Sequence, residues 1–273
     1  MEKTDSRYRH FVQILREELV PAMGCTEPIA IAYGAAKARE VLGHLPERML
    51  VEASGNIIKN VKSVVVPNTG GLKGIAAAAA AGAVAGDPGK ILEVISSVTQ
   101  EQKAEIKDYL ERREIQVRPA PGEVVFDVIL TLWAGGDSVR LRIADYHTNI
   151  VLIEKNGEPL LKCGTVTPAG EAASGLTDRS CLSVDAIVDF ADTVALEDVA
   201  APVERQLEYN CAIAREGMAR DWGANIGKVL REYYGEDVKV RARYMAAAGS
   251  DARMSGCEMP VIIVSGSGNQ GLT

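Results

Sequence analysis

Apolar residues recur at helical spacing in two segments at the start of the chain. The first, over residues 8–19, collects them on one face: Phe11, Ile14, Leu15 and Leu19. Pro21 ends this helix, because proline has no N–H to donate and its ring clashes with the preceding turn. Thr26 is a suitable N-cap for the second helix, which the pattern predicts from Ile29 to Leu42.

The pattern then changes to runs of β-branched residues, which predict strands. Two such runs cover residues 49–54 and 61–66. A longer β-rich block, from Ile115 to Lys162, contains a strong hairpin signal at Asn156-Gly-Glu158. Its predicted strands are Val124–Trp133, Ser138–Ala144, Ile150–Lys155 and Pro159–Lys162.

Further helices are predicted on both sides of this block. An alanine-rich helix covers Ile75–Ala85, and a longer amphipathic one covers Ile91–Arg113. After Ser183, which has capping character, helical periodicity returns in Ala200–Arg215 and Gly223–Tyr234, whereas residues 238–242 are ambiguous. These runs of strands bounded by helices lack regular β–α alternation. They predict an α+β fold, with helices on an antiparallel or mixed sheet and a mostly helical C-terminal segment.

The polar, glycine-containing stretch Gly164–Ser180 is the best candidate for a domain boundary. It divides the chain into an α+β domain, residues 1–180, and a helical domain, residues 181–273. An apolar run, Pro260–Val264, precedes a final loop rich in serine and glycine. Such a loop normally opens a helix. We expect none here, and we therefore expect residues 265–273 to be mobile or held by a neighbouring molecule, in a C-terminally truncated chain.

Charge and cysteine content narrow the class of protein. A net charge of −7 over 273 residues argues against a nucleic-acid partner. No signal peptide is evident, and Ile75–Ala85 is too short to span a membrane, so we expect a cytoplasmic protein. Its five cysteines are scattered and odd in number, which disfavours a disulfide framework. With three histidines and no paired Cys motif, a zinc site is not expected.

Cys25 is the first candidate for chemistry, because it lies at a predicted helix N-terminus. There the helix dipole favours thiolate over thiol, although Glu27 would oppose part of that effect. The alternative is a buried structural cysteine beside an ordinary cap. His147 lies in the polar cluster Asp145–Asn149 between two predicted strands. It could take part in catalysis or merely satisfy a turn, and both interpretations remain open.

The loop Pro67–Gly74 is a candidate anion site, because a strand enters it and a helix follows. Backbone N–H groups at such a junction point outward, and glycines leave room for a ligand. Asn68, Thr69, Gly70 and Gly71 would line it. A plain connector between strand and helix is the alternative.

Three stretches together resemble the L-cysteine desulfidase family, which is related to the alpha chain of iron–sulfur L-serine dehydratases. They are Met23-Gly-Cys-Thr-Glu-Pro28, Pro67-Asn-Thr-Gly-Gly71, and Ser265-Gly-Ser-Gly-Asn-Gln-Gly271 preceded by Gly249-Ser-Asp-Ala-Arg253. The resemblance implies a cytoplasmic lyase with a 4Fe–4S cluster and no pyridoxal phosphate. It would convert L-cysteine to pyruvate, ammonia and sulfide, or L-serine to pyruvate and ammonia.

The resemblance also implies roles for individual residues. Cys25 falls on the family's catalysis-associated cysteine, and the family's cluster-binding cysteines lie beyond the final loop of this chain. We therefore expect no metal ligands, no cluster and no measurable desulfidase activity from the chain as given. The candidate catalytic residues are Cys25, Glu27 and His147. The candidate substrate-binding residues are Thr26, Asn68, Thr69, Gly70, Gly71, Ser265, Gly266, Ser267 and Asn269.

Two functions of other classes remain open. One is a nucleophilic hydrolase that uses Cys25 and His147, which would require the two side chains within hydrogen-bond reach. The other is a non-catalytic remnant that binds a small molecule. For the lyase, the expected partner is a small amino acid, with a homo-oligomer as a further possibility and no nucleic-acid or membrane partner.

Overall fold

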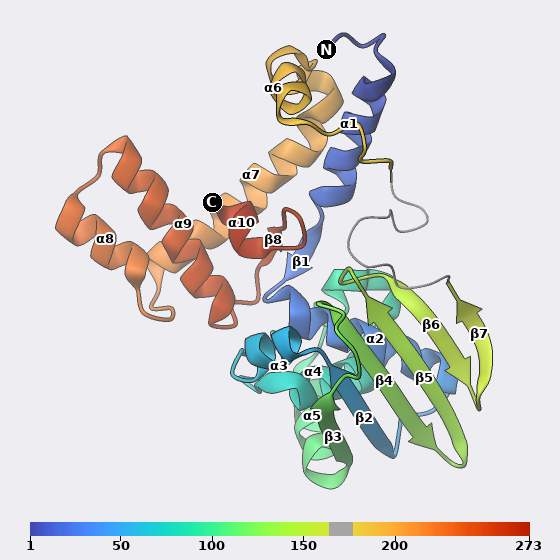
Figure 1. Ribbon diagram of the computed structural model, residues 1–273. Coiled ribbons are helices and arrows are strands. Elements are labelled where there is room, and N and C mark those ends of the chain that lie inside the picture. The colour runs from blue at the N-terminus through green and yellow to red at the C-terminus, as the bar shows by residue number, and fades with distance from the viewer. Residues whose placement is uncertain (164–176) are drawn as a thin grey trace.

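A mixed six-stranded sheet forms the framework of the N-terminal part in the computed structural model, which describes residues 1–163 and 177–273 (Figure 1). The strand order is β3-β2-β4-β5-β6-β7. The pair β2–β3 is parallel and the other neighbours are antiparallel, which confirms the predicted sheet type. The strands are β2 (Arg48–Ala53), β3 (Glu114–Pro119), β4 (Asp127–Ala134), β5 (Asp137–Ala144), β6 (Ile150–Lys155) and β7 (Glu158–Lys162).

Two alanine-rich helices pack in layers behind the sheet. Helix α2 (Thr26–Leu42) lies on β4 and β5, and α4 (Gly74–Ala85) packs on α2 (Figure 1). The face toward α2 is formed by alternate residues of β4 and β5, all fully buried: Val128, Leu130, Leu132, Val139, Leu141 and Ile143. A Cβ on Gly82 would lie 2.0 Å from the Ala32 carbonyl oxygen, so glycine is what permits α4 to approach α2 this closely.

The rest of the described chain is mostly helical, as predicted. It contains α6 (Val184–Thr193), α7 (Leu196–Ala219), α8 (Ile226–Tyr234) and α9 (Val238–Met254). Helix α1 (Ser6–Glu18) lies beside α6 and α7, away from the sheet (Figure 1). Its Tyr8 and Phe11 rings pack on Phe190 of α6, with centroids 5.5 and 5.0 Å apart. The first helix of the chain therefore packs with the C-terminal helices.

The two ends of the chain meet in a small two-stranded sheet. Strand β1 (Pro21–Met23) pairs antiparallel with β8 (Pro260–Ile262), and the short helix α10 (Gly268–Leu272) follows. The buried Asn210 of α7 holds this region together. Its Nδ2 donates to the carbonyl oxygens of Ile262 (3.0 Å) and Gly271 (2.7 Å), and its Oδ1 accepts from the Ile262 N–H (2.8 Å).

Replacing Asn210 by alanine should lower the free energy of unfolding by about 2–4 kcal/mol. The change leaves buried backbone groups without partners, and each such group costs on the order of 1–3 kcal/mol. Urea denaturation followed by circular dichroism measures the effect. Asn56→Ala, at an exposed position, is the control and should change little. Equal, small shifts in both variants would show that the Asn210 hydrogen bonds contribute little.

The structure corrects two predicted elements between residues 55 and 113. Residues 61–66 do not form a strand. Val61, the first of them, is the last residue of helix α3 (Gly55–Val61), where Ile57 and Val61 are buried on the same face of the helix. Residues 91–113 are not one helix, since a 3-10 helix (Pro88–Glu93) is separated from α5 (Gln100–Arg112). Thr99 and Gln102 form a capping box that starts α5 afresh.

Two predictions about helix ends are also wrong. The N-cap of α2 is Cys25 and not Thr26, which is the first residue of the helix. The final loop does open a helix, α10, whose N-cap Ser267 accepts from the Gln270 N–H (3.3 Å). Of the predicted boundary Gly164–Ser180, residues 164–176 lie outside the described residues. No helix within the described ranges is long and apolar enough to cross a membrane.

Candidate functional site

Cys25 and Glu27 are joined by a hydrogen bond at the start of α2. The Cys25 thiol donates to Glu27 Oε2 at 2.8 Å, and Asn60 Nδ2 donates to the other carboxylate oxygen at 3.4 Å. Cys25 is only 6% exposed, whereas Glu27 is half-buried. Because β1 ends at Met23 and Gly24 turns the chain with φ +57°, these two side chains emerge together at the helix start.

Burial sets the protonation state of Cys25, and hydrogen bonds set that of Glu27. Burial raises the pKa of Cys25 to about 12, and the Glu27 carboxylate contributes in the same direction. The predicted thiolate is therefore wrong for the free protein, since burial outweighs the helix dipole. Burial also raises the pKa of Glu27. Hydrogen bonds from Cys25, from its own N–H and from Asn60 outweigh burial and leave that pKa below its ordinary value. At neutral pH the pair is a thiol beside a carboxylate.

This protonation state predicts that Cys25 resists alkylation. At pH 8, iodoacetamide should modify the exposed Cys163 at least ten times faster than Cys25, because the thiolate is the reactive form. In Glu27→Gln, the carboxylate that raises the pKa of Cys25 is absent, so the alkylation rate should increase. Peptide mass spectrometry over time measures both rates. Faster modification of Cys25 than of Cys163 in the native protein would contradict the buried-thiol assignment.

The loop between β8 and α10 closes over the same helix start. Thr26 Oγ1 donates to the Gly266 carbonyl oxygen at 2.9 Å. Within this loop, Ser265 and Gly266 have φ values of +47° and +74°, and Val264 and Ser267 exchange backbone hydrogen bonds. The loop is therefore a tight turn fixed to the first residue of α2.

His147 reaches this turn from the loop between β5 and β6. A Cβ added to Gly266 would lie 3.0 Å from His147 Cε1 and Nδ1, so the imidazole lies against this glycine. The ring packs on Phe126 with centroids 4.5 Å apart. Burial lowers the pKa of His147, and the Arg253 charge lowers it further, whereas Glu27 opposes both. The imidazole is therefore neutral at neutral pH and able to accept a proton.

Arg253 forms hydrogen bonds with Gly24, before α2, and with Asn269, after the β8–α10 turn, and the sequence predicted no role for it. Near the end of α9, Arg253 is 4% exposed. Its Nε donates to the Gly24 carbonyl oxygen and its Nη1 to Asn269 Oδ1, both at 2.8 Å. The available signal was an arginine within a helix otherwise rich in small residues, Ala246–Arg253. Arginine is almost never fully buried unless its guanidinium is paired with other groups.

The loop after α3 lies beside Gly24, and its polar side chains bind backbone carbonyl oxygens. Pro67 packs on Gly24, where a Cβ would lie 2.4 Å from Pro67 Cγ, so the two loops are neighbours. The buried side chains of Asn68 and Thr69, however, donate to the carbonyl oxygens of Ile95, Ser96 and Val66. Gly70 and Gly71 are exposed, with nothing within 4 Å of an added Cβ. The structure therefore gives Asn68 and Thr69 a role in shaping the loop.

Comparison with known proteins places this chain in a family. Residues 89–273 match the serine dehydratase alpha chain family. The chain belongs to this family. This membership agrees with the family resemblance of the three sequence stretches.

Several curated proteins match this chain over nearly its whole length. A UPF0597 protein of Desulfitobacterium hafniense (strain Y51) is 60% identical over 273 residues, 100% of this chain. UPF0597 proteins of Lachnoclostridium phytofermentans and Treponema denticola are 49% and 46% identical over 97% and 100% of it. The chain spans 63% or 64% of the length of these relatives. No solved structure matches the chain.

The described residues alone do not fit the iron–sulfur cluster that the resemblance implies. A 4Fe–4S cluster requires several cysteine thiolates around one point. Within residues 1–163 and 177–273, no three His, Cys, Asp or Glu side chains gather in an arrangement that could hold a metal ion. Cys25 and Cys257 are buried, Cys163 is exposed, and the other two cysteines are intermediate, all of them free. The thiol of Cys25 is engaged with a carboxylate instead.

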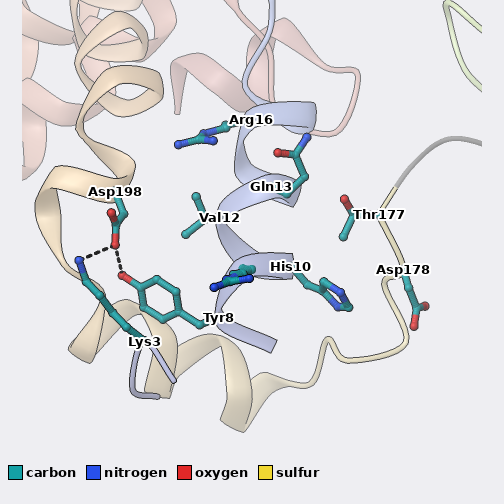
Figure 2. Close-up of a pocket in the computed structure, with 10 residues that line it drawn as sticks. Lys3, Tyr8, His10, Val12, Gln13, Arg16, Thr177, Asp178 and Asp198 are labelled. Atoms are coloured by element: carbon teal, nitrogen blue, oxygen red, sulfur yellow. Dashed lines mark hydrogen bonds and ion pairs between the residues drawn. The ribbon is translucent and has the colours of Figure 1, made fainter. Parts of the chain in front are cut away.

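A cavity of about 710 Å³ lies elsewhere, between α1 and the residues around Thr177 (Figure 2). It is lined by basic and polar side chains and contains none of the predicted site residues. Figure 2 shows Asp198 between Lys3 and Tyr8, with distances of 2.8 and 2.7 Å. The carboxylate is thus already paired and serves to fix α1 to α7. The chemistry-bearing cluster is the one around Cys25.

Proposed function

We propose that this chain carries the proton-transfer site of a β-eliminating amino-acid lyase. The substrate is L-cysteine, which yields pyruvate, ammonia and sulfide, or L-serine, which yields pyruvate and ammonia. The observation that supports this proposal is the 2.8 Å hydrogen bond from the Cys25 thiol to the Glu27 carboxylate, close to a neutral imidazole. Family membership agrees with lyase chemistry.

Elimination begins with removal of the proton at Cα. Cys25 takes that proton on its sulfur while its own proton passes along the existing hydrogen bond to Glu27 Oε2. Glu27 is an ionised acceptor because its pKa is lowered, and no free thiolate has to exist in the resting protein. The electron pair of the broken C–H bond forms the Cα–Cβ double bond, and HS⁻ or HO⁻ leaves from Cβ. The resulting aminoacrylate tautomerises and reacts with water to give pyruvate and ammonia.

The remaining side chains prepare the site for this transfer. His147 is neutral, so its free ring nitrogen can accept a proton from Glu27 and return the carboxylate to its starting form. Thr26 fixes the Ser265–Gly268 turn against the start of α2. The 4Fe–4S cluster remains a prediction of the family resemblance. We also propose a cytoplasmic location, which agrees with five free cysteines.

The hydrolase alternative receives less support. It requires a hydrogen bond from the Cys25 thiol to His147, and the thiol donates to Glu27 instead. A thiol with a pKa of about 12 is also a poor nucleophile at neutral pH.

The proposal is tested by exchange of the α-proton, the step that these residues perform. L-serine and L-cysteine are incubated with the protein in D2O, and NMR follows deuterium incorporation at Cα, with pyruvate measured in parallel. Wild-type protein should catalyse exchange, Cys25→Ala should lose it, and Cys211→Ala is the control. Exchange that survives in Cys25→Ala would overturn the proposal. Pyruvate release by the wild type would refute only the expectation that this chain lacks net activity.

A further inference from the structure

Arg253 is a buried cation without an anionic partner. Its side chain is 4% exposed, and none of the ion pairs within 4.0 Å between described residues includes it. Removing a guanidinium from water costs several kcal/mol by general estimates, and a nearby anion normally offsets that cost. The other strongly buried charge, Asp127, illustrates the usual solution, since Arg142 binds it through two hydrogen bonds of 2.8 and 2.9 Å.

One edge of the Arg253 guanidinium is free. A guanidinium has five N–H groups. Nε and Nη1 donate to Gly24, Asn269 and the Met254 sulfur, but Nη2 has no acceptor among the described residues. Among the described residues, Nε of Arg39 is the side-chain nitrogen or oxygen that has no solvent exposure and no hydrogen-bond partner, so Arg253 Nη2 is not such an atom. Nη2 of Arg253 is therefore an unpaired donor that is not fully sealed from solvent.

The surroundings place the Arg253 guanidinium beside the start of α2, because its Nε donates to the carbonyl oxygen of Gly24, the neighbour of Cys25 in the chain. Burial lowers the pKa of Arg253, and the negative charge of Glu27 acts on it in the opposite direction, so this carboxylate is an electrostatic neighbour. Gly268 makes the position possible, because a Cβ there would lie 2.3 Å from Arg253 Nε and 2.9 Å from Nη2. The turn that carries Gly266 thus also lies against the guanidinium.

We propose that Arg253 binds the α-carboxylate of the amino-acid substrate through Nη2, an assignment that rests on the proposed function. A planar guanidinium matches a carboxylate in shape and charge. With its carboxylate on Arg253, an α-amino acid has its Cα one bond away from the anchored group, within the cluster that contains Cys25. The site then selects amino acids over amines that lack a carboxylate.

Binding is measured separately from turnover, with L-alanine as the probe. L-alanine has the carboxylate and amino group but no leaving group. Ethylamine, which is L-alanine without its carboxylate, is the matched ligand, and sodium sulfate tests for a general anion site. Titration of protein with 15N-labelled arginine should shift the Arg253 Nε–H signal with L-alanine, and both other ligands should bind at least tenfold more weakly. Equal binding of L-alanine and ethylamine, or of L-alanine and sulfate, would overturn the assignment, as would no binding of L-alanine.

Variants provide a second, independent measurement by calorimetry. Arg253→Gln should lose L-alanine affinity at least tenfold, Arg253→Lys should fall between it and the wild type, and the exposed Arg220→Gln should behave as wild type. Unchanged affinity in folded Arg253→Gln would refute the proposal. If that variant does not fold, the ligand series on the wild type decides.

The two proposals fail in distinguishable ways. Cys25→Ala should retain L-alanine binding while it loses α-proton exchange. Carboxylate-selective binding without any exchange in the wild type would contradict the lyase and leave Arg253 as a carboxylate-binding residue. Exchange that is unchanged in Arg253→Gln would support the lyase and remove Arg253 from the substrate site.

Discussion

Replacing Glu27 by glutamine should slow α-proton exchange by about 10²–10⁴-fold, the usual contribution of a positioned proton acceptor. The amide keeps the size of the side chain but cannot take the Cys25 proton at neutral pH. The measurement is deuterium incorporation at Cα of L-serine. Glu208→Gln, at an exposed position on α7, is the control and should retain the wild-type rate.

The pH dependence gives a separate check on Glu27. Its pKa lies below the ordinary value of 4.5, so the carboxylate stays ionised as the pH falls to that value. The contribution of Glu27 to the exchange rate should therefore persist to lower pH than that of an ordinary glutamate and be lost as the pH falls through its lowered pKa. If the residual exchange of Glu27→Gln showed the same decline below pH 4.5 as the wild type, another group would be the acceptor.

Replacing Gly82 by alanine should destabilise the fold by about 3 kcal/mol or more, the upper part of the range for overpacking. The new methyl group would lie 2.0 Å from the Ala32 carbonyl oxygen, and this backbone atom cannot move without separating α2 from α4. Urea denaturation measures the loss. Gly55→Ala is the matched control in α3, because nothing lies within 4 Å of its added Cβ, and it should be neutral or slightly stabilising. Similar midpoints for the two variants would contradict the packing argument.

Local spacing explains why part of the site could be predicted from the sequence. Cys25 and Glu27 are two positions apart at a helix start, so their proximity follows from the predicted element itself. The charge state of Cys25 did not follow, because the helix dipole is visible in the sequence and burial is not. Similarly, the β-branched residues around Val61 suggested a strand, although the spacing of Ile57 and Val61 suits the helix that forms.

Arg253 could not be placed from local patterns. Its hydrogen bond to Gly24 spans 229 positions along the chain, so no local pattern could indicate that the two residues meet. The start of α5, in contrast, has a local signal, because Thr99 and Gln102 have the capping-box spacing. The apolar periodicity that continues across this position led to the prediction of one longer helix.

The joining of the two chain ends by β1 and β8 has a consequence for folding during synthesis. The Thr26–Gly266 contact spans 240 positions, so the start of α2 has no partner until the segment around Gly266 has been synthesised. Contacts of such long range form late, because closing a long loop costs entropy before any contact repays it. The sheet and α2 can assemble on the ribosome, since their strands end at Lys162. The proton-transfer groups, by comparison, acquire their full surroundings only after the segment that contains Gly266 has been synthesised.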